Sequence, residues 1–227
     1  MTMMPAPAAG ARLRAPRTAA VAGILFSLLL MASFSLLRLA ITAEAQEAGT
    51  WLKTRANVVT LALNLVPFAG IAFLWFIGVL RDRLGEREDR FFATVFLGSG
   101  LLFLAMLFLS AAVTGGLIVA NLSAPAGLSG STTFSFARAI TYEVMNVYAI
   151  KMAGVFMIST STLALRTGFL ARWITWLGYA FALLLLLSNR HIEGVMLIFP
   201  AWVLLISLYI LIDNLRAPPP APPGAGG

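Results

Sequence analysis

Residues 92–113 read FATVFLGSGLLFLAMLFLSAAV, a run of 22 residues without a charged side chain. A helix of about 20 apolar residues crosses the roughly 30 Å hydrocarbon core of a bilayer. The run is continuous rather than alternating, which favours a helix over a transmembrane β-strand. A helix also satisfies its own backbone hydrogen bonds, as hydrocarbon requires. This stretch therefore predicts a transmembrane helix.

Five further stretches share this character, which is typical of a multi-pass membrane protein. Of the 227 residues, 60% are hydrophobic and only 11% are charged, whereas about a quarter of a soluble domain is charged. We therefore predict an all-α integral membrane bundle of six transmembrane helices. The expected spans are residues 20–42, 58–80, 92–113, 144–165, 170–187 and 195–212. The basic segment 1–19 and the Pro- and Gly-rich segment 214–227 are predicted to be disordered tails.

The third apolar run continues to Ala120, which is too long for one straight crossing of the bilayer. We expect Thr114, Gly115 and Gly116 to break the helix, so that the span ends near Val113. The segment 121–143 is predicted to be a loop, because it is rich in Ser, Gly and Thr and too polar to enter lipid.

The basic residues predict the orientation of the bundle. With the N-terminus inside, ten of them fall on the inner side: Arg12, Arg14, Arg17, Arg81, Arg83, Arg87, Arg90, Arg166, Arg172 and Arg216. Four fall outside, namely Lys53, Arg55, Arg138 and Arg190. The positive-inside rule then predicts that both ends are cytoplasmic, in a bacterial-type cytoplasmic (inner) membrane. The alternative for the first span is a signal peptide cleaved near Ala43, Glu44 and Ala45, which leaves five spans.

The same charge distribution bears on partners. Topology and attraction to anionic lipid account for the net charge of +7, so no nucleic-acid partner is expected. The expected partners are the lipid bilayer and either a second copy of the chain or a membrane partner subunit.

The composition excludes several kinds of site. The chain has no Cys and one His, which excludes disulfides, iron–sulfur clusters, Cys nucleophiles, zinc sites built on Cys or several His, and haem held by two His. No phosphate-binding G-x-x-x-x-G-K-[ST] motif is present either. We expect no cofactor, no metal site and no catalytic residue set.

Ionisable residues within spans are candidates for function, because they are costly in lipid. Lys151 and Arg38 qualify, and both fall in the predicted outer half of the bilayer. Asn64 lies at a similar depth on the second span. We predict an outward-facing polar pocket among the first, second and fourth spans, with ligand-binding residues Lys151, Asn64, Arg38, Tyr148 and Glu143. The alternative is structural: Arg38 snorkels to the head groups, and Lys151 does so or pairs with Glu143.

A charged string joins the second and third spans, GVLRDRLGER at residues 78–87. It resembles the G-x-x-x-D-R-x-G-R-R motif of major facilitator transporters. The residues that match are Gly78, Asp82, Arg83, Gly85 and Arg87, and Glu86 replaces a basic residue. The resemblance implies a transporter whose acidic residue caps helix contacts that change during transport. This chain would supply half of such a protein and would pair with another half. The alternative is a solvated hairpin with local ion pairs.

Two short strings resemble motifs of rhomboid intramembrane proteases: GLSG at residues 127–130 and HIEG at residues 191–194. The resemblance implies that Ser129 is the nucleophile and His191 the base. The sequence departs from that pattern, because Ser129 precedes the apolar part of the fourth span by about fourteen residues.

The strings FLWFIGVLRDRLG at residues 73–85 and FFATVFLG at residues 91–98 resemble uncharacterised bacterial multi-pass membrane proteins, for which no activity is implied. We therefore expect a non-enzymatic role, either small-solute transport or that of an accessory or assembly subunit. The alternative is a rhomboid-like intramembrane serine protease or another membrane-embedded enzyme.

Overall fold

The computed structural model describes residues 15–41, 49–84, 90–123, 127–188 and 194–216. These residues form helices joined by short turns, which confirms the prediction of an all-α chain. The α-helices are α1 (Ala15–Ala40), α3 (Trp51–Thr54), α4 (Ala56–Leu84), α5 (Arg90–Ser123), α6 (Thr132–Glu143), α7 (Ile150–Thr167), α8 (Arg172–Leu187) and α9 (Ile198–Arg216). A π-helical segment, Val144–Ala149, joins α6 to α7, and a 3-10 turn, Val195–Leu197, precedes α9.

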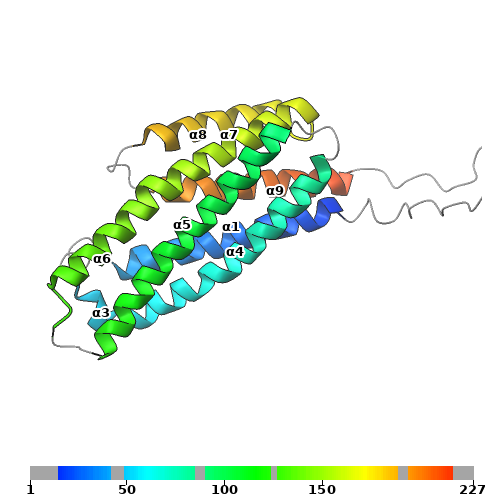
Figure 1. Ribbon diagram of the computed structural model, residues 1–227. Helices are drawn as coiled ribbons and strands as arrows, with labels where there is room; N and C mark the ends of the chain where they lie inside the picture. The colour runs from blue at the N-terminus through cyan, green and yellow to red at the C-terminus, as the bar shows by residue number, and fades with distance from the viewer. Residues whose placement is uncertain (1–14, 42–48, 85–89, 124–126, 189–193, 217–227) are drawn as a thin grey trace, which may run out of the picture.

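The long helices lie side by side and cross the molecule in alternating directions (Figure 1). The start of α1 and the end of α9 lie at one end of the bundle, together with the end of α4. We call this the Arg81 end. The opposite end holds α3, the start of α4 and the end of α5, and we call it the Lys53 end. Helix α1 packs between α4 and α9, while α7 packs against α5 and α8.

Five helical stretches among the described residues are long and apolar enough to cross a membrane. They are Thr18–Ala40, Ala56–Arg81, Ala93–Ser123, Thr132–Thr167 and Val195–Arg216. The predicted fifth span corresponds to α8, a shorter apolar helix of 16 residues. Its length is about 24 Å, which is less than the roughly 30 Å hydrocarbon core. The structure therefore gives five candidate spans where the sequence predicted six. Helix α8 still runs back along α7, as Figure 1 shows.

The predicted break of the helix after Val113 is wrong. Helix α5 continues through Thr114, Gly115 and Gly116 to Ser123, a total of 34 residues. The Thr114 hydroxyl donates to the Ser110 carbonyl at 2.9 Å, so its polar group is satisfied within the helix. Each glycine costs about 1 kcal/mol relative to alanine, which is too little to end a helix whose neighbours are apolar.

The predicted loop over residues 121–143 is also largely helical. Helix α6 begins after Ser131, whose side chain accepts a hydrogen bond from the Phe134 backbone N–H at 3.2 Å. This is an N-cap, and it satisfies one of the free donors of the first turn. Phe134 is buried in a cluster with Trp51 and Leu117. The burial of Phe134 and the Ser131 cap stabilise this polar helix. The average polarity of the segment, on which the loop prediction was based, reflects neither contact.

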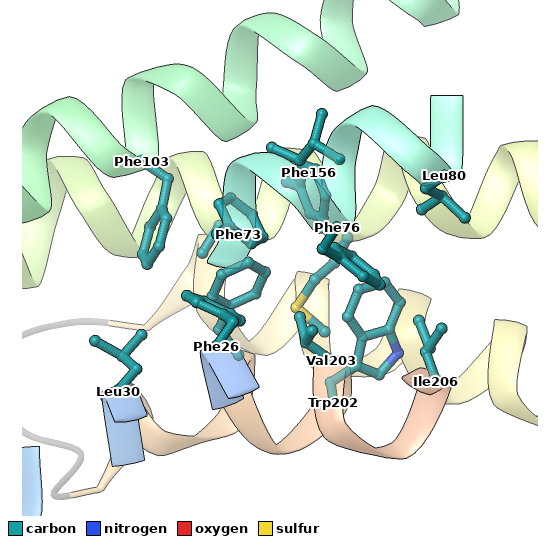
Figure 2. Close-up of a cluster of buried hydrophobic side chains, with 14 of the residues drawn as sticks. Phe26, Leu30, Phe73, Phe76, Leu80, Phe103, Phe156, Trp202, Val203 and Ile206 are labelled. Atoms are coloured by element: carbon teal, nitrogen blue, oxygen red, sulfur yellow. The ribbon is translucent and has the colours of Figure 1, made fainter. Parts of the chain in front are cut away.

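Five phenylalanines that come from the five long helices pack together at the centre of the bundle. Figure 2 labels four of them, Phe26, Phe73, Phe103 and Phe156. The ring centroids of Phe26 (α1) and Phe73 (α4) are 4.5 Å apart, and those of Phe103 (α5) and Phe199 (α9) are 4.7 Å apart. Phe156 (α7) lies 5.2 Å from Phe73. These separations are those of favourable aromatic pairs. We call these five side chains the aromatic centre.

The packing of α1 predicts an effect of substituting Gly23. A Cβ atom at Gly23 would meet the Ser207 hydroxyl and would lie 2.8 Å from a Phe76 ring carbon. We expect Gly23→Ala to destabilise the fold by about 1–3 kcal/mol through overpacking. The measurement is the thermal unfolding midpoint of the detergent-purified protein.

The matched control is Gly98→Ala, because nothing lies within 4 Å of a Cβ atom at that helical position. It should be neutral or stabilising by up to about 1 kcal/mol, since alanine has the higher helix propensity. Equal unfolding midpoints for the two variants would contradict the packing described here.

Candidate functional site

A hollow of about 550 Å³ lies between α4 and α5. We call it the α4–α5 groove. Helix α4 contributes Thr60, Leu63, Asn64, Val66 and Pro67 to its wall. Helix α5 forms the opposite wall, from Phe108 to Leu122. The groove is mostly apolar and open along its side, so a molecule in the lipid phase can enter it without passing through the bundle.

The polar part of the groove comes from α4. Thr60, Asn64 and Pro67 are spaced by four and three residues, so they share one helical face, and all three are exposed. No hydrogen-bond partner for the Asn64 carboxamide lies among the described residues. Pro67 has no N–H, so the Leu63 carbonyl lacks its usual donor. The groove therefore offers hydrogen-bonding groups on an otherwise apolar wall.

Small residues on α5 leave the space open. Ala111, Ala112 and Gly115 line the groove. A Cβ atom at Gly115 would meet only the Leu63 side chain, at 3.9 Å. At the deeper end, the Phe108 ring packs against Gly70 of α4 and closes the groove. The slot runs from Phe108 toward the Lys53 end of the bundle.

Two cations lie at that end of the bundle. Lys53 belongs to the single turn α3, and Arg55 follows α3 and immediately precedes α4. Both side chains are exposed, and neither has an ion-pair partner in the part of the chain that the structure describes. Trp51 and Leu52 are buried and anchor this turn. The start of α4 adds the positive end of a helix dipole, which has the same sign as these two described cations.

Lys151 faces a different helix. Its ammonium donates to the Leu186 carbonyl at 2.6 Å, between α7 and α8. Leu186 lies in the last turn of α8, where carbonyls lack partners within the helix and the dipole is negative. Lys151 therefore caps α8 from α7. It is not among the residues that line the α4–α5 groove.

The remaining predicted pocket residues also lie away from the groove wall. Arg38 is exposed in the last turn of α1, with Nη1 3.9 Å from the position of a Cβ atom at Gly194. Tyr148 is 58% exposed and belongs to the π-helical segment, and Glu143 is half-buried just before it. The structure thus brings Glu143, Tyr148 and Lys151 to one stretch of the chain and Asn64 to the groove. Ligand binding by these residues stays a prediction.

The motif that resembles the facilitator loop is partly helical. Gly78, Asp82 and Arg83 lie in the last turns of α4. Gly85 and Arg87 lie outside the described residues. Gly78 is exposed, and nothing lies within 4 Å of a Cβ atom there, so no close helix contact requires glycine at this position.

The two residues of the rhomboid resemblance are placed only in part. Ser129 lies in the turn before α6, and its hydroxyl is buried with no hydrogen-bond partner among the described residues. His191 lies outside the described residues. Within the described part of the chain, no group of three or more His, Cys, Asp or Glu residues is placed to hold a metal ion.

No protein-family model matches this chain, and comparison with curated proteins and with solved structures gives no match. The residue roles proposed below rest on the chain's own geometry.

The sequence predicted a residue of one wall of the groove but none of the other wall. Asn64, a polar residue predicted to line a pocket, lies on the α4 wall. The α5 wall was missed because the predicted span ended near Val113, whereas Ile118, Val119 and Leu122 extend the groove beyond that point. The signal was present in the sequence, since the apolar run continues to Ala120.

The Lys151 contact predicts a loss of stability when the ammonium is removed. Lys151→Met should lower the free energy of unfolding by about 1–2 kcal/mol, because a hydrogen bond from a charged donor is lost and the Leu186 carbonyl is left without that donor. Thermal unfolding in detergent measures this effect. Arg81→Met is the control, since Arg81 is exposed and lies away from both Lys151 and the groove, so its loss should be neutral. An unfolding midpoint for Lys151→Met at or above that of the unaltered protein would rule out the capping role.

Proposed function

We propose that this chain is a non-enzymatic protein of a bacterial-type cytoplasmic membrane, and that it acts as an accessory or assembly subunit which binds at the side of its bundle. The observation that carries this proposal is the aromatic centre. Phe26, Phe73 and Phe156 are fully buried there, and Phe103 and Phe199 are nearly so. A carrier needs a polar site near the bilayer midplane, and packed phenyl rings do not provide one.

The exposed side of the bundle supports the same proposal. The α4–α5 groove opens sideways, and Leu122 of its α5 wall is exposed. Trp75, farther along α4, is exposed as well. A surface of this kind contacts lipid or another membrane protein. Binding at the side requires no passage through the aromatic centre.

The proposed orientation places the Arg81 end in the cytoplasm. Arg81, Arg166, Arg172 and Arg216 occupy helix ends at that side, against Lys53, Arg55 and Arg138 toward the other. This distribution follows the positive-inside rule. With α8 counted as a sixth, short traverse, the start of α1 and the end of α9 lie on the same side, in agreement with their common end in Figure 1.

Small-solute transport is the second candidate, because polar side chains lie inside the bundle. The Ser161 hydroxyl, the Trp202 indole N–H and the Ser207 hydroxyl are buried without hydrogen-bond partners among the described residues. The hydroxyls of Thr162 and Tyr179 lie 2.7 Å apart and share a hydrogen bond. These groups would line a polar route as far as the aromatic centre, and transport would require that centre to open.

The state of the protein after gentle extraction tests the proposal. Purified in mild detergent from cells that produce it naturally, the chain should elute with a protein mass of at least twice its own 24.3 kDa, as an oligomer or in a complex. Light scattering measures the protein mass separately from the detergent. A monomer that takes up a labelled solute when reconstituted in vesicles would favour the transport candidate instead.

Ser129→Ala tests the enzyme alternative. We expect the variant to leave the cleavage of membrane proteins unchanged, because the described residues place no base beside the Ser129 hydroxyl. Mass spectrometry of protein N-termini, in cells that carry the variant or the unaltered chain, measures cleavage. Loss of a defined cleavage product in the variant would establish an enzyme and overturn the proposed role.

A further inference from the structure

The α4–α5 groove combines three features that are separate in the sequence. They are an apolar slot, the Asn64 amide, and two cations toward one end; within the described ranges neither the amide nor the cations have a partner. We propose that the groove binds one anionic phospholipid. An acyl chain lies in the slot, Asn64 donates to an ester carbonyl, and the charged head group lies near Lys53 and Arg55. This inference goes beyond the proposed function and applies equally to a subunit or a carrier.

The length of the groove fits an acyl chain. Its α5 wall runs from Phe108 to Leu122, fifteen residues that rise about 21 Å along the helix. One leaflet of the hydrocarbon core is about 15 Å deep, so the groove is long enough for the chains of one leaflet.

Asn64 lies within the hydrocarbon, below the ester level of a lipid leaflet. Asn64 lies eight residues into α4, which is about 12 Å from the helix start. The candidate span Ala56–Arg81 is about 39 Å long and exceeds the hydrocarbon core by several Å at each end. Asn64 therefore lies in the outer part of the hydrocarbon, and its short side chain cannot reach water as Lys or Arg can. By the same figures Asn64 lies about 7–8 Å inside the outer boundary of the hydrocarbon, so the acceptor for its amide has to be an ester carbonyl that descends into the groove with its acyl chain.

The charge at the Lys53 end selects an anionic head group. Lys53 and Arg55 are exposed and have no ion-pair partner among the described residues, and the helix dipole at the start of α4 has the same sign. A juxtamembrane Lys or Arg attracts anionic lipid. A zwitterionic head group gains less from this site, so we expect the groove to discriminate between head groups as well as to hold a chain.

The experiment measures lipid binding to the full-length protein. Native mass spectrometry of protein in mild detergent should show one retained phosphatidylglycerol per chain, with phosphatidylcholine retained at least about tenfold less. Added phosphatidylglycerol should raise the thermal unfolding midpoint by about 3–5 °C, because a ligand that binds only the folded state stabilises it.

Matched variants locate the lipid. Gly115→Leu fills the slot and should lower retention at least about tenfold, while Gly116→Leu changes the neighbouring exposed residue outside the groove and should retain the lipid. Both positions leave room for a side chain, so the fold tolerates either change. Asn64→Leu should weaken retention, with Asn57→Leu as its control.

The head-group preference has its own pair of variants. Lys53→Gln with Arg55→Gln should remove the preference for phosphatidylglycerol, whereas Arg81→Gln with Arg216→Gln makes the same change of charge at the other end and should keep it. Three results would overturn the inference. The first is equal lipid retention by Gly115→Leu and Gly116→Leu, and the second is equal affinity for the two lipids. The third is a dimer that dissociates in Gly115→Leu but not in Gly116→Leu, which would identify a second copy of the chain as the occupant of the groove.

Discussion

The rest of the structure depends on the contact of five phenylalanine rings at the centre of the bundle. Each ring comes from a different long helix, and Phe73 lies within 5.7 Å of the centroids of Phe103 and Phe199 as well as closer to Phe26 and Phe156. In lipid the hydrophobic effect does not drive helices together, so packing of this kind must do it. The rings fix which helices are neighbours, and they close the middle of the protein.

Because the centre is closed, we propose that the protein binds its partner at the surface of the bundle. Helix α4 presents Phe73 and Phe76 to the interior and Asn64 and Pro67 to the outside, so one helix provides both the core and the groove. The small residues of α5 do not fill the space opposite Asn64, whereas the larger Phe108 closes it at depth. The groove is therefore a direct result of side-chain size along two neighbouring helices.

The sequence predicted what depends on local composition and spacing. Apolar runs predicted the helical class and five of the candidate spans, and the polar residue Asn64 on an apolar helix marked the α4 wall of the groove. Contacts between segments that are far apart in the chain could not be predicted from the sequence. Lys151 meets Leu186 only because α8 packs back on α7, and the helix over residues 132–143 depends on Phe134 meeting Trp51 and Leu117. The continuation of α5 past Gly116 was not predicted, because two glycines suggest a helix end although their cost of about 1 kcal/mol each does not break an apolar helix.

Fluorescence quenching of single-tryptophan variants tests the closed centre most directly. Trp202 is 1% exposed and lies beside Phe76 near the aromatic centre (Figure 2), while Trp75 on α4 is 63% exposed. With the other tryptophans changed to phenylalanine and the protein in vesicles, Trp202 should resist quenching by both acrylamide in water and brominated lipid. Trp75 should be quenched by the brominated lipid. Strong quenching of Trp202 by acrylamide would show that water reaches the centre and would contradict the account.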